Sequence, residues 1–103
     1  MDGNLELVAA GVLNGTGTPS WTINNGGFGA IVDNGTGDYT VTMNKQVDPT
    51  EAIILHNRTG VTTGGQSACQ MASDTTLEVH SYAADGTAAD GSIAIAIYRR
   101  ITV

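Results

Sequence analysis

Short runs of alternating apolar and polar residues recur along the whole chain, and Gly or Asn residues separate them. Alternation with a period of two places apolar side chains on one face of a β-strand, and no long segment shows the period of an amphipathic helix. Thr, Ile and Val supply 30 of the 103 residues, and their branched side chains favour strands. The pattern therefore predicts an all-β domain.

Eight segments fit this alternation, and their spacing of roughly 8–12 residues is typical of β-sandwiches and barrels. We expect about eight short antiparallel strands in a jelly-roll-like β-sandwich that forms a single domain over residues 1–103. An immunoglobulin-like strand order is equally compatible with this pattern. The expected strands are Leu5–Leu13, Trp21–Asn24, Phe28–Val32, Asp38–Asn44, Ala52–His56, Ser67–Met71, Thr76–Ala83 and Ser92–Tyr98.

The segments between these strands carry clear turn signals. Asn25-Gly26-Gly27 predicts a tight hairpin between its two neighbouring strands, because Asn-Gly readily supplies the positive φ that such turns need. The tetrapeptide Asn-Gly-Thr-Gly occurs at 14–17 and again at 34–37, and predicts two turns of similar geometry. Asp48-Pro49-Thr50-Glu51 predicts at most one short helical turn near 48–52, since Asp is a helix cap and Pro suits the first helical position.

The charge of the chain excludes two classes of partner. There are 4 basic and 10 acidic residues, for a net charge of −6. Proteins bind nucleic acids and anionic membranes mainly through Lys and Arg, so neither is an expected partner. The N-terminus shows no secretory signal, which predicts a protein made in the cytoplasm.

Residues that could carry catalysis are sparse, and we expect neither an enzyme nor a cofactor. His56 and His80 are the only histidines, and no nucleophile elbow, zinc motif or phosphate-binding loop accompanies them. The single cysteine, Cys69, has small and apolar neighbours and is expected to be a buried, unreactive thiol. Asp33 and Asp38 flank an Asn-Gly turn, which leaves open either a structural Ca²⁺ or ordinary turn capping.

The last expected strand is apolar on both faces. Ile93, Ile95 and Ile97 alternate with Ala94, Ala96 and Tyr98. A strand without a polar face is covered on both sides. The sandwich core provides one cover, and either a loop or a neighbouring subunit provides the other. Because Leu, Ile, Val and Phe together number only 22, we expect self-association and assign all six residues to a subunit contact.

Two segments resemble small β-domains of bacteriophage virion proteins. Gly35-Thr36-Gly37-Asp38-Tyr39-Thr40-Val41-Thr42-Met43 is similar to a strand of tail-fibre domains in which Phe usually stands in place of Met43. Residues 76–98 resemble the closing hairpin of those domains, with Asp85-Gly86-Thr87-Ala88-Ala89-Asp90 as its loop. Among virion proteins, the small size and acidic charge look most like capsid decoration (cement) proteins, which commonly form trimers.

This resemblance implies a non-enzymatic protein on the outer surface of a phage capsid, where a homotrimer bridges subunits of the major capsid protein. We expect the capsid contact at an amino-terminal docking strand with Leu5, Leu7 and Val8, assisted by Arg99 and Arg100. The alternative is a receptor-binding tip or tail-associated module that recognises a host surface glycan. Its candidate contacts are Trp21, Tyr82 and residues 57–66.

Overall fold

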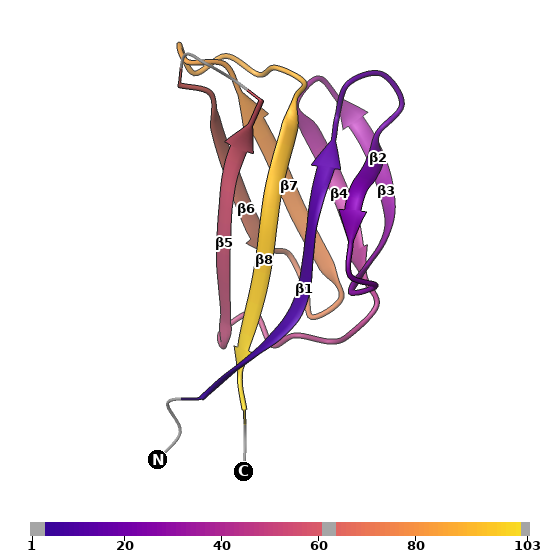
Figure 1. The fold of residues 1–103 in the computed structure, drawn as a ribbon, viewed down its shortest axis with the longest axis vertical. Coiled ribbons are helices and arrows are strands. Elements are labelled where there is room, and N and C mark those ends of the chain that lie inside the picture. The colour runs from indigo at the N-terminus through magenta and orange to yellow at the C-terminus, as the bar shows by residue number, and fades with distance from the viewer. Residues whose placement is uncertain (1–3, 61–63, 102–103) are drawn as a thin grey trace.

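The computed structural model describes residues 4–60 and 64–101, which form eight antiparallel strands in two sheets (Figure 1). Within these residues there is no helix of any kind. The strands are β1 (Leu5–Asn14), β2 (Ser20–Asn24), β3 (Phe28–Gly35), β4 (Asp38–Met43), β5 (Ala52–Thr59), β6 (Gln66–Met71), β7 (Thr76–Tyr82) and β8 (Ser92–Arg100). The predicted all-β sandwich of eight strands is confirmed.

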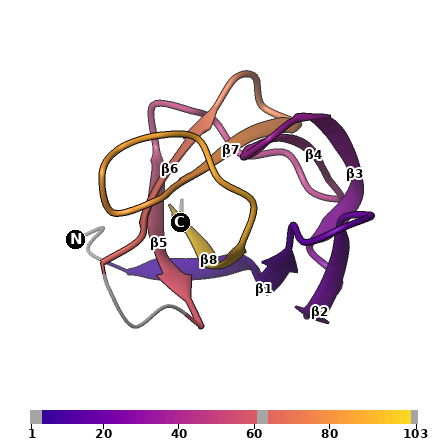
Figure 2. The same ribbon diagram turned by 90° about the horizontal axis from the view of Figure 1, so that it is seen from above.

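The two sheets have the strand orders β2-β1-β8-β5 and β3-β4-β7-β6. Figure 2 shows them facing each other, with the segment between β7 and β8 crossing one open end. The first and last strands pair at the centre of one sheet, and β4 pairs with β7 at the centre of the other. The central pairs therefore join strands that are distant in sequence, while β1–β2, β3–β4 and β6–β7 are pairs of consecutive strands. Both ends of the chain lie at the end of the sandwich opposite the β7–β8 segment (Figure 1).

Two expected hairpins are absent from this arrangement. β2 and β3 lie in different sheets, so the Asn25-Gly26-Gly27 turn carries the chain from one layer to the other. β7 and β8 also lie in different sheets, which corrects the closing hairpin that the resemblance implied. A turn signal indicates a change of direction, but it does not say whether the next strand pairs with the previous one or crosses the sandwich.

The predicted helical turn near 48–52 is a single hydrogen-bonded turn that leads into β5. The amide of Glu51 donates to the carbonyl of Asp48 at 2.9 Å, and the Asp48 carboxylate accepts from the amide of Thr50 at 2.9 Å. The hydrogen bonds that the Asp48 carboxylate accepts from the amide and then from the hydroxyl of Thr50 hold its pKa below the usual value. The chain then becomes extended at Ala52, as its β-branched residues favour.

The core lies between the sheets and draws on both of them. Tyr39, Val41 and Met43 of β4 point inward as their alternation predicts, and the isoleucines of β8 point inward from the other sheet. The buried apolar side chains are Val8, Ala9, Leu13, Phe28, Tyr39, Val41, Met43, Val47, Leu77, Val79, Ile93, Ile95 and Ile97.

A β-bulge in β1 changes which side chains of the amino-terminal segment face the core. Leu7 lies opposite Tyr98 of β8, and Ala9 lies opposite Ile97, so Val8 is an extra residue. Val8 and Ala9 are both buried, whereas Leu7 is exposed. Strict alternation along the expected strand Leu5–Leu13 predicts that Leu5 and Leu7 share a face with Ala9, and the bulge shows this prediction to be wrong. An extra residue in a strand reverses the facing of everything before it.

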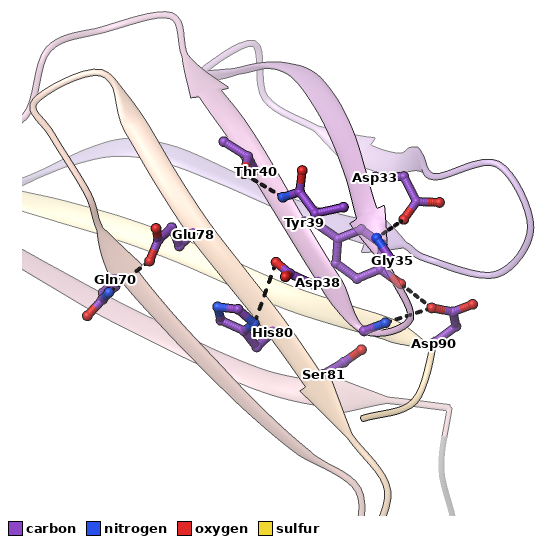
Figure 3. Close-up of polar contacts among 12 residues, drawn as sticks. Asp33, Gly35, Asp38, Tyr39, Thr40, Gln70, Glu78, His80, Ser81 and Asp90 are labelled. Carbon is purple, nitrogen blue, oxygen red and sulfur yellow. Dashed lines mark hydrogen bonds and ion pairs between the residues drawn. The ribbon is translucent and has the colours of Figure 1, made fainter. Parts of the chain in front are cut away.

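Polar groups close the end of the sandwich farthest from the termini (Figure 3). The Tyr39 hydroxyl donates to the Asp90 carboxylate at 2.9 Å, and the amide of Gly37 donates to the same oxygen at 2.9 Å. The carbonyl of Gly15 lies 3.2 Å from the Tyr39 hydroxyl. The two Asn-Gly-Thr-Gly turns are thus linked through Tyr39 and Asp90: Gly15 of the first turn bonds to the tyrosine hydroxyl, and Gly37 of the second bonds to the aspartate.

Candidate functional site

The outer surface of the β2-β1-β8-β5 sheet is apolar over its central part. Pairing register places Ile53, Tyr98 and Leu7 in one row across three strands. Neighbouring rows contain further aliphatic side chains, and together they form a surface that we call the apolar face. It comprises Leu5, Leu7, Ala10, Val12, Ile23, Ile53, Leu55, Ala94, Ala96 and Tyr98.

The large side chains of the apolar face are accessible to solvent. Ile23 is 61% exposed, Leu55 57%, Leu5 48%, Ile53 45% and Leu7 43%. Scattered exposed aliphatic residues are normal on protein surfaces, but a continuous apolar patch on one sheet marks an interaction site. This face is the candidate functional site of the protein.

A shallow groove of about 350 Å³ lies in the middle of the apolar face. Its floor is formed by small residues of the two central strands, including Ala10, Ala94 and Ala96, while Ile23 and Leu55 stand on opposite sides of it. The hollow exists because small side chains occupy the central strands and large ones occupy the edge strands. A hollow of this shape has room for a ridge of apolar side chains.

Polar and charged side chains cover the outer surface of the other sheet (Figure 3). Gln70 donates a hydrogen bond to Glu78 at 2.8 Å, and His80 Nδ1 lies 3.7 Å from the Asp38 carboxylate. Leu77, Val79 and Ser81 point to the opposite side and are buried, as the alternation of β7 predicts. The two outer surfaces of the sandwich therefore differ sharply in character.

The six-residue subunit contact expected on the last strand is divided by the fold. Ile93, Ile95 and Ile97 are buried in the sandwich core, at 0–3% exposure, so they are not available to another subunit. Ala94, Ala96 and Tyr98 point outward from β8 into the apolar face and are half-buried. The core covers the side of the strand that carries the isoleucines, and the side that carries Ala94, Ala96 and Tyr98 lies at the outer surface of the sheet.

The expected capsid contact is divided in the same way. Val8 is buried in the core, which corrects its assignment to a contact surface. Arg99 Nε donates to Glu6 at 2.9 Å and Arg99 Nη1 donates to the carbonyl of Gln46, and Arg100 pairs with Glu51. The Arg99 guanidinium lowers the pKa of Glu6. Leu5 and Leu7 remain exposed beside these ion pairs, at the end of the sheet where the termini lie.

The histidines, the cysteine and the turn aspartates occupy several places in the fold, and His80 lies beside both Asp38 and Cys69. His56 Nδ1 lies 2.7 Å from the Ser67 hydroxyl, and His80 lies on the polar outer surface of the other sheet. Cys69 is half-buried against the core, and burial raises the pKa of its thiol to about 12. Asp33 accepts a hydrogen bond from Gly35 within its own turn, and residues 4–60 and 64–101 contain no cluster of three or more metal-ligating side chains.

The residues suggested for glycan binding are only partly free. The Trp21 ring stacks on Phe28 with centroids 4.6 Å apart, and its indole N–H donates to the carbonyl of Gly29. Tyr82 lies near His80, with ring centroids 6.4 Å apart. Of the suggested segment 57–66, residues 57–59 belong to β5, and residues 61–63 lie outside the described part of the chain.

Comparison with protein-family models, with curated proteins and with solved structures finds no match to this chain. Across the described residues, no helix is long and apolar enough to cross a membrane. The apolar face is therefore the feature of this molecule that bears most directly on its function. Sequence reasoning did not assign Ile23, Ile53 or Leu55 to a site, although the Ala-Ile-Ile-Leu run of β5 lacks a polar face just as β8 does.

Proposed function

We propose that the protein is a non-enzymatic structural component of a virus particle, a bacteriophage capsid decoration protein that acts as a homotrimer on the outer capsid surface. The observation that carries the proposal is the exposed apolar face of one sheet, beside a second sheet with a polar outer surface. A protein with this division of surfaces gains stability when other proteins cover the apolar side. The resemblance of residues 35–43 to phage virion strands supports a viral setting.

The proposed contact with the major capsid protein is the open edge of β1 near its start. β2 pairs with β1 from Gly11 to Asn14, so the stretch Leu5–Leu7 has a described ladder partner on one side, β8. An open strand edge can accept a strand from another protein. Leu5 and Leu7 flank this edge with exposed apolar side chains. The coat contact proposed here is therefore at the end of the sandwich that holds both termini.

A decoration protein of this kind works by binding alone. Binding to the assembled capsid but not to dispersed subunits shifts the equilibrium toward the assembled state by mass action. Three copies in one trimer would engage neighbouring coat subunits together, so modest single contacts add up to firm attachment. This role needs none of the reactive groups that the fold leaves dispersed.

The test adds purified protein to virus heads assembled from the coat protein of the same virus and measures co-sedimentation. We expect saturable binding to heads, no binding to dispersed coat subunits, and loss of head binding in a Leu5→Asp/Leu7→Asp variant. Val32→Asp is the matched control, because Val32 is 53% exposed and lies on the other sheet. Head binding unaffected by the double substitution would contradict the coat contact. Absence of head binding, with the wild-type protein blocking infection of host cells, would contradict the proposal in favour of a receptor-binding module.

A further inference from the structure

We infer that the part of the apolar face around the groove, without Leu5 and Leu7 at the end of the sheet, is the contact between copies of this chain, and that Leu55 of one copy fills the groove lined by Ala10, Ala94 and Ala96 of the next. The assignment rests on the self-association in the proposed function, but not on a viral partner. It places the anchor of the contact on β5, at an edge of the sheet. β8, at the centre of the sheet, contributes small residues.

The shape of the face is self-complementary. The groove has a floor of small side chains, and Leu55 and Ile53 form a ridge beside it on the same surface. A ridge and a hollow on one surface allow identical copies to pack against each other around a rotation axis, with each copy supplying a ridge and receiving one. Most of the groove lining is apolar, with Asn24, Asn25 and Asn57 as its polar members, so an aliphatic side chain that enters the groove meets mainly apolar surface.

The charge distribution favours an identical copy as the occupant. The chain has a net charge of −6, so two copies repel each other wherever their acidic side chains meet. No described residue of the apolar face is charged. Described acidic residues lie on the other sheet, in turns or at the sheet end, as Asp38, Glu78 and Asp48 illustrate. A face built to attract a basic partner would carry acidic groups around its centre.

The outer limits of the face have the polar character of an interface rim. Asn14, Ser92 and Asn57 lie toward the end of the sheet far from the termini, and Arg100 pairs with Glu51 at the other end. Protein interfaces typically combine an apolar centre with a polar border. The apolar rows are enclosed between these two borders.

The area of the sheet is sufficient for a stable contact. Strands about 4.8 Å apart, with about eight residues that each rise about 3.3 Å, give a four-strand face of roughly 500 Å². Two such surfaces bury on the order of 1,000 Å², which is the lower bound for a specific interface. A contact of this size depends on its best-packed residues, so removal of one anchor should weaken it strongly.

The test compares Leu55→Asp with Val32→Asp by sedimentation equilibrium of the full chain over a wide concentration range. The two residues are exposed to 57% and 53%, and both lie on edge strands, but on different sheets. We expect the wild-type protein and Val32→Asp to be oligomers. For Leu55→Asp we expect a dissociation constant about 100-fold higher than that of the wild type, or a 10.5 kDa monomer at every concentration. Circular dichroism and thermal unfolding confirm that each variant is folded.

Ala96→Leu is a milder second variant that fills the groove without adding charge. Like Leu55→Asp, it should weaken the association between copies. Wild-type protein that is monomeric at every concentration would overturn the inference. Equal effects of Leu55→Asp and Val32→Asp on association, with both variants folded, would also overturn it. A dimer that depends on Leu55 would support the inferred contact between copies and contradict only the trimer of the proposed function. An oligomer that depends on Leu55 but does not bind virus heads would also support this contact, and would contradict only the capsid role.

Discussion

Leu7 lies opposite Tyr98 in the pairing of β1 with β8, whereas Ala9, two positions later, lies opposite Ile97. Tyr98 points away from the core and Ile97 points into it. The bulge at Val8 therefore turns the first residues of β1 outward and adds Leu5 and Leu7 to the apolar face. A single extra residue in the ladder extends the exposed apolar surface to the end of the sheet that holds the termini.

The bulge predicts opposite consequences for two adjacent substitutions. Val8→Ala removes two methyl groups from a buried position and should lower the free energy of unfolding by about 2 kcal/mol. Leu7→Ala shortens an exposed side chain and should change the stability of the isolated monomer by less than about 0.5 kcal/mol. Urea unfolding of both variants, made in a Leu55→Asp background that keeps the chain monomeric, measures the difference. A larger loss for Leu7→Ala would mean that the bulge is misplaced.

The two Asn-Gly-Thr-Gly turns should respond differently to the same substitution. Gly17 and Gly37 have φ of 69° and 67°, so Ala at either position incurs backbone strain of about 1–2 kcal/mol. No atom lies within 4 Å of a Cβ built at Gly17, but a Cβ at Gly37 would lie 2.4 Å from the carbonyl oxygen of Ser81. We therefore expect Gly37→Ala to lower the melting temperature clearly more than Gly17→Ala. Equal shifts in thermal unfolding would contradict the close packing of the second turn.

Tyr39→Phe tests the polar closure at the same end of the sandwich. The substitution retains the buried ring but removes the hydrogen bond to Asp90, and leaves the carbonyl of Gly15 without its hydroxyl partner. Loss of a hydrogen bond to a charged group, with the acceptor retained, should cost about 1.5–3 kcal/mol. Chemical denaturation at pH 7 measures this cost. A loss below about 0.5 kcal/mol would show that the hydroxyl contributes little to the fold.

The same tyrosine makes stability depend on alkaline pH. Burial, with hydrogen bonding to Asp90 as the second cause, raises the pKa of Tyr39 from its ordinary value of 10.0 to about 12 in the folded protein. A raised pKa means that the folded state holds the phenol proton more tightly than the unfolded state does. The resulting contribution of Tyr39 to the free energy of unfolding is fully present below pH 10 and is lost as the pH rises through 12. The stability gap between wild type and Tyr39→Phe should therefore narrow between pH 10 and 12. A gap that stays constant over that range in chemical denaturation would contradict the raised pKa.

Residue alternation was sufficient to predict the number of strands and most of their inward faces. Tyr39, Val41, Leu77 and Val79 all point into the core as their spacing requires. Periodicity reports local backbone geometry, and these strands have no irregularity near those residues. For the same reason it failed at Leu5 and Leu7, because a bulge depends on pairing with β8 and leaves no local signature.

The arrangement of the strands and the full extent of the apolar face could be established only from the structure. The resemblance implied that Thr76–Ala83 and Ser92–Tyr98 form a hairpin, but β7 and β8 belong to opposite sheets. Ile53 and Leu55 lie some forty residues before Ala96 in sequence, and only the pairing of β5 with β8 brings them together. Contacts of this kind arise from topology, which local patterns do not specify.

The central claim is that other copies of the chain cover the apolar face. The most direct measurement is the mass of the unmodified protein in solution, determined by sedimentation equilibrium at several concentrations. The account predicts a species of three times the 10.5 kDa chain mass that dissociates on dilution. A mass of one chain at every concentration would contradict it.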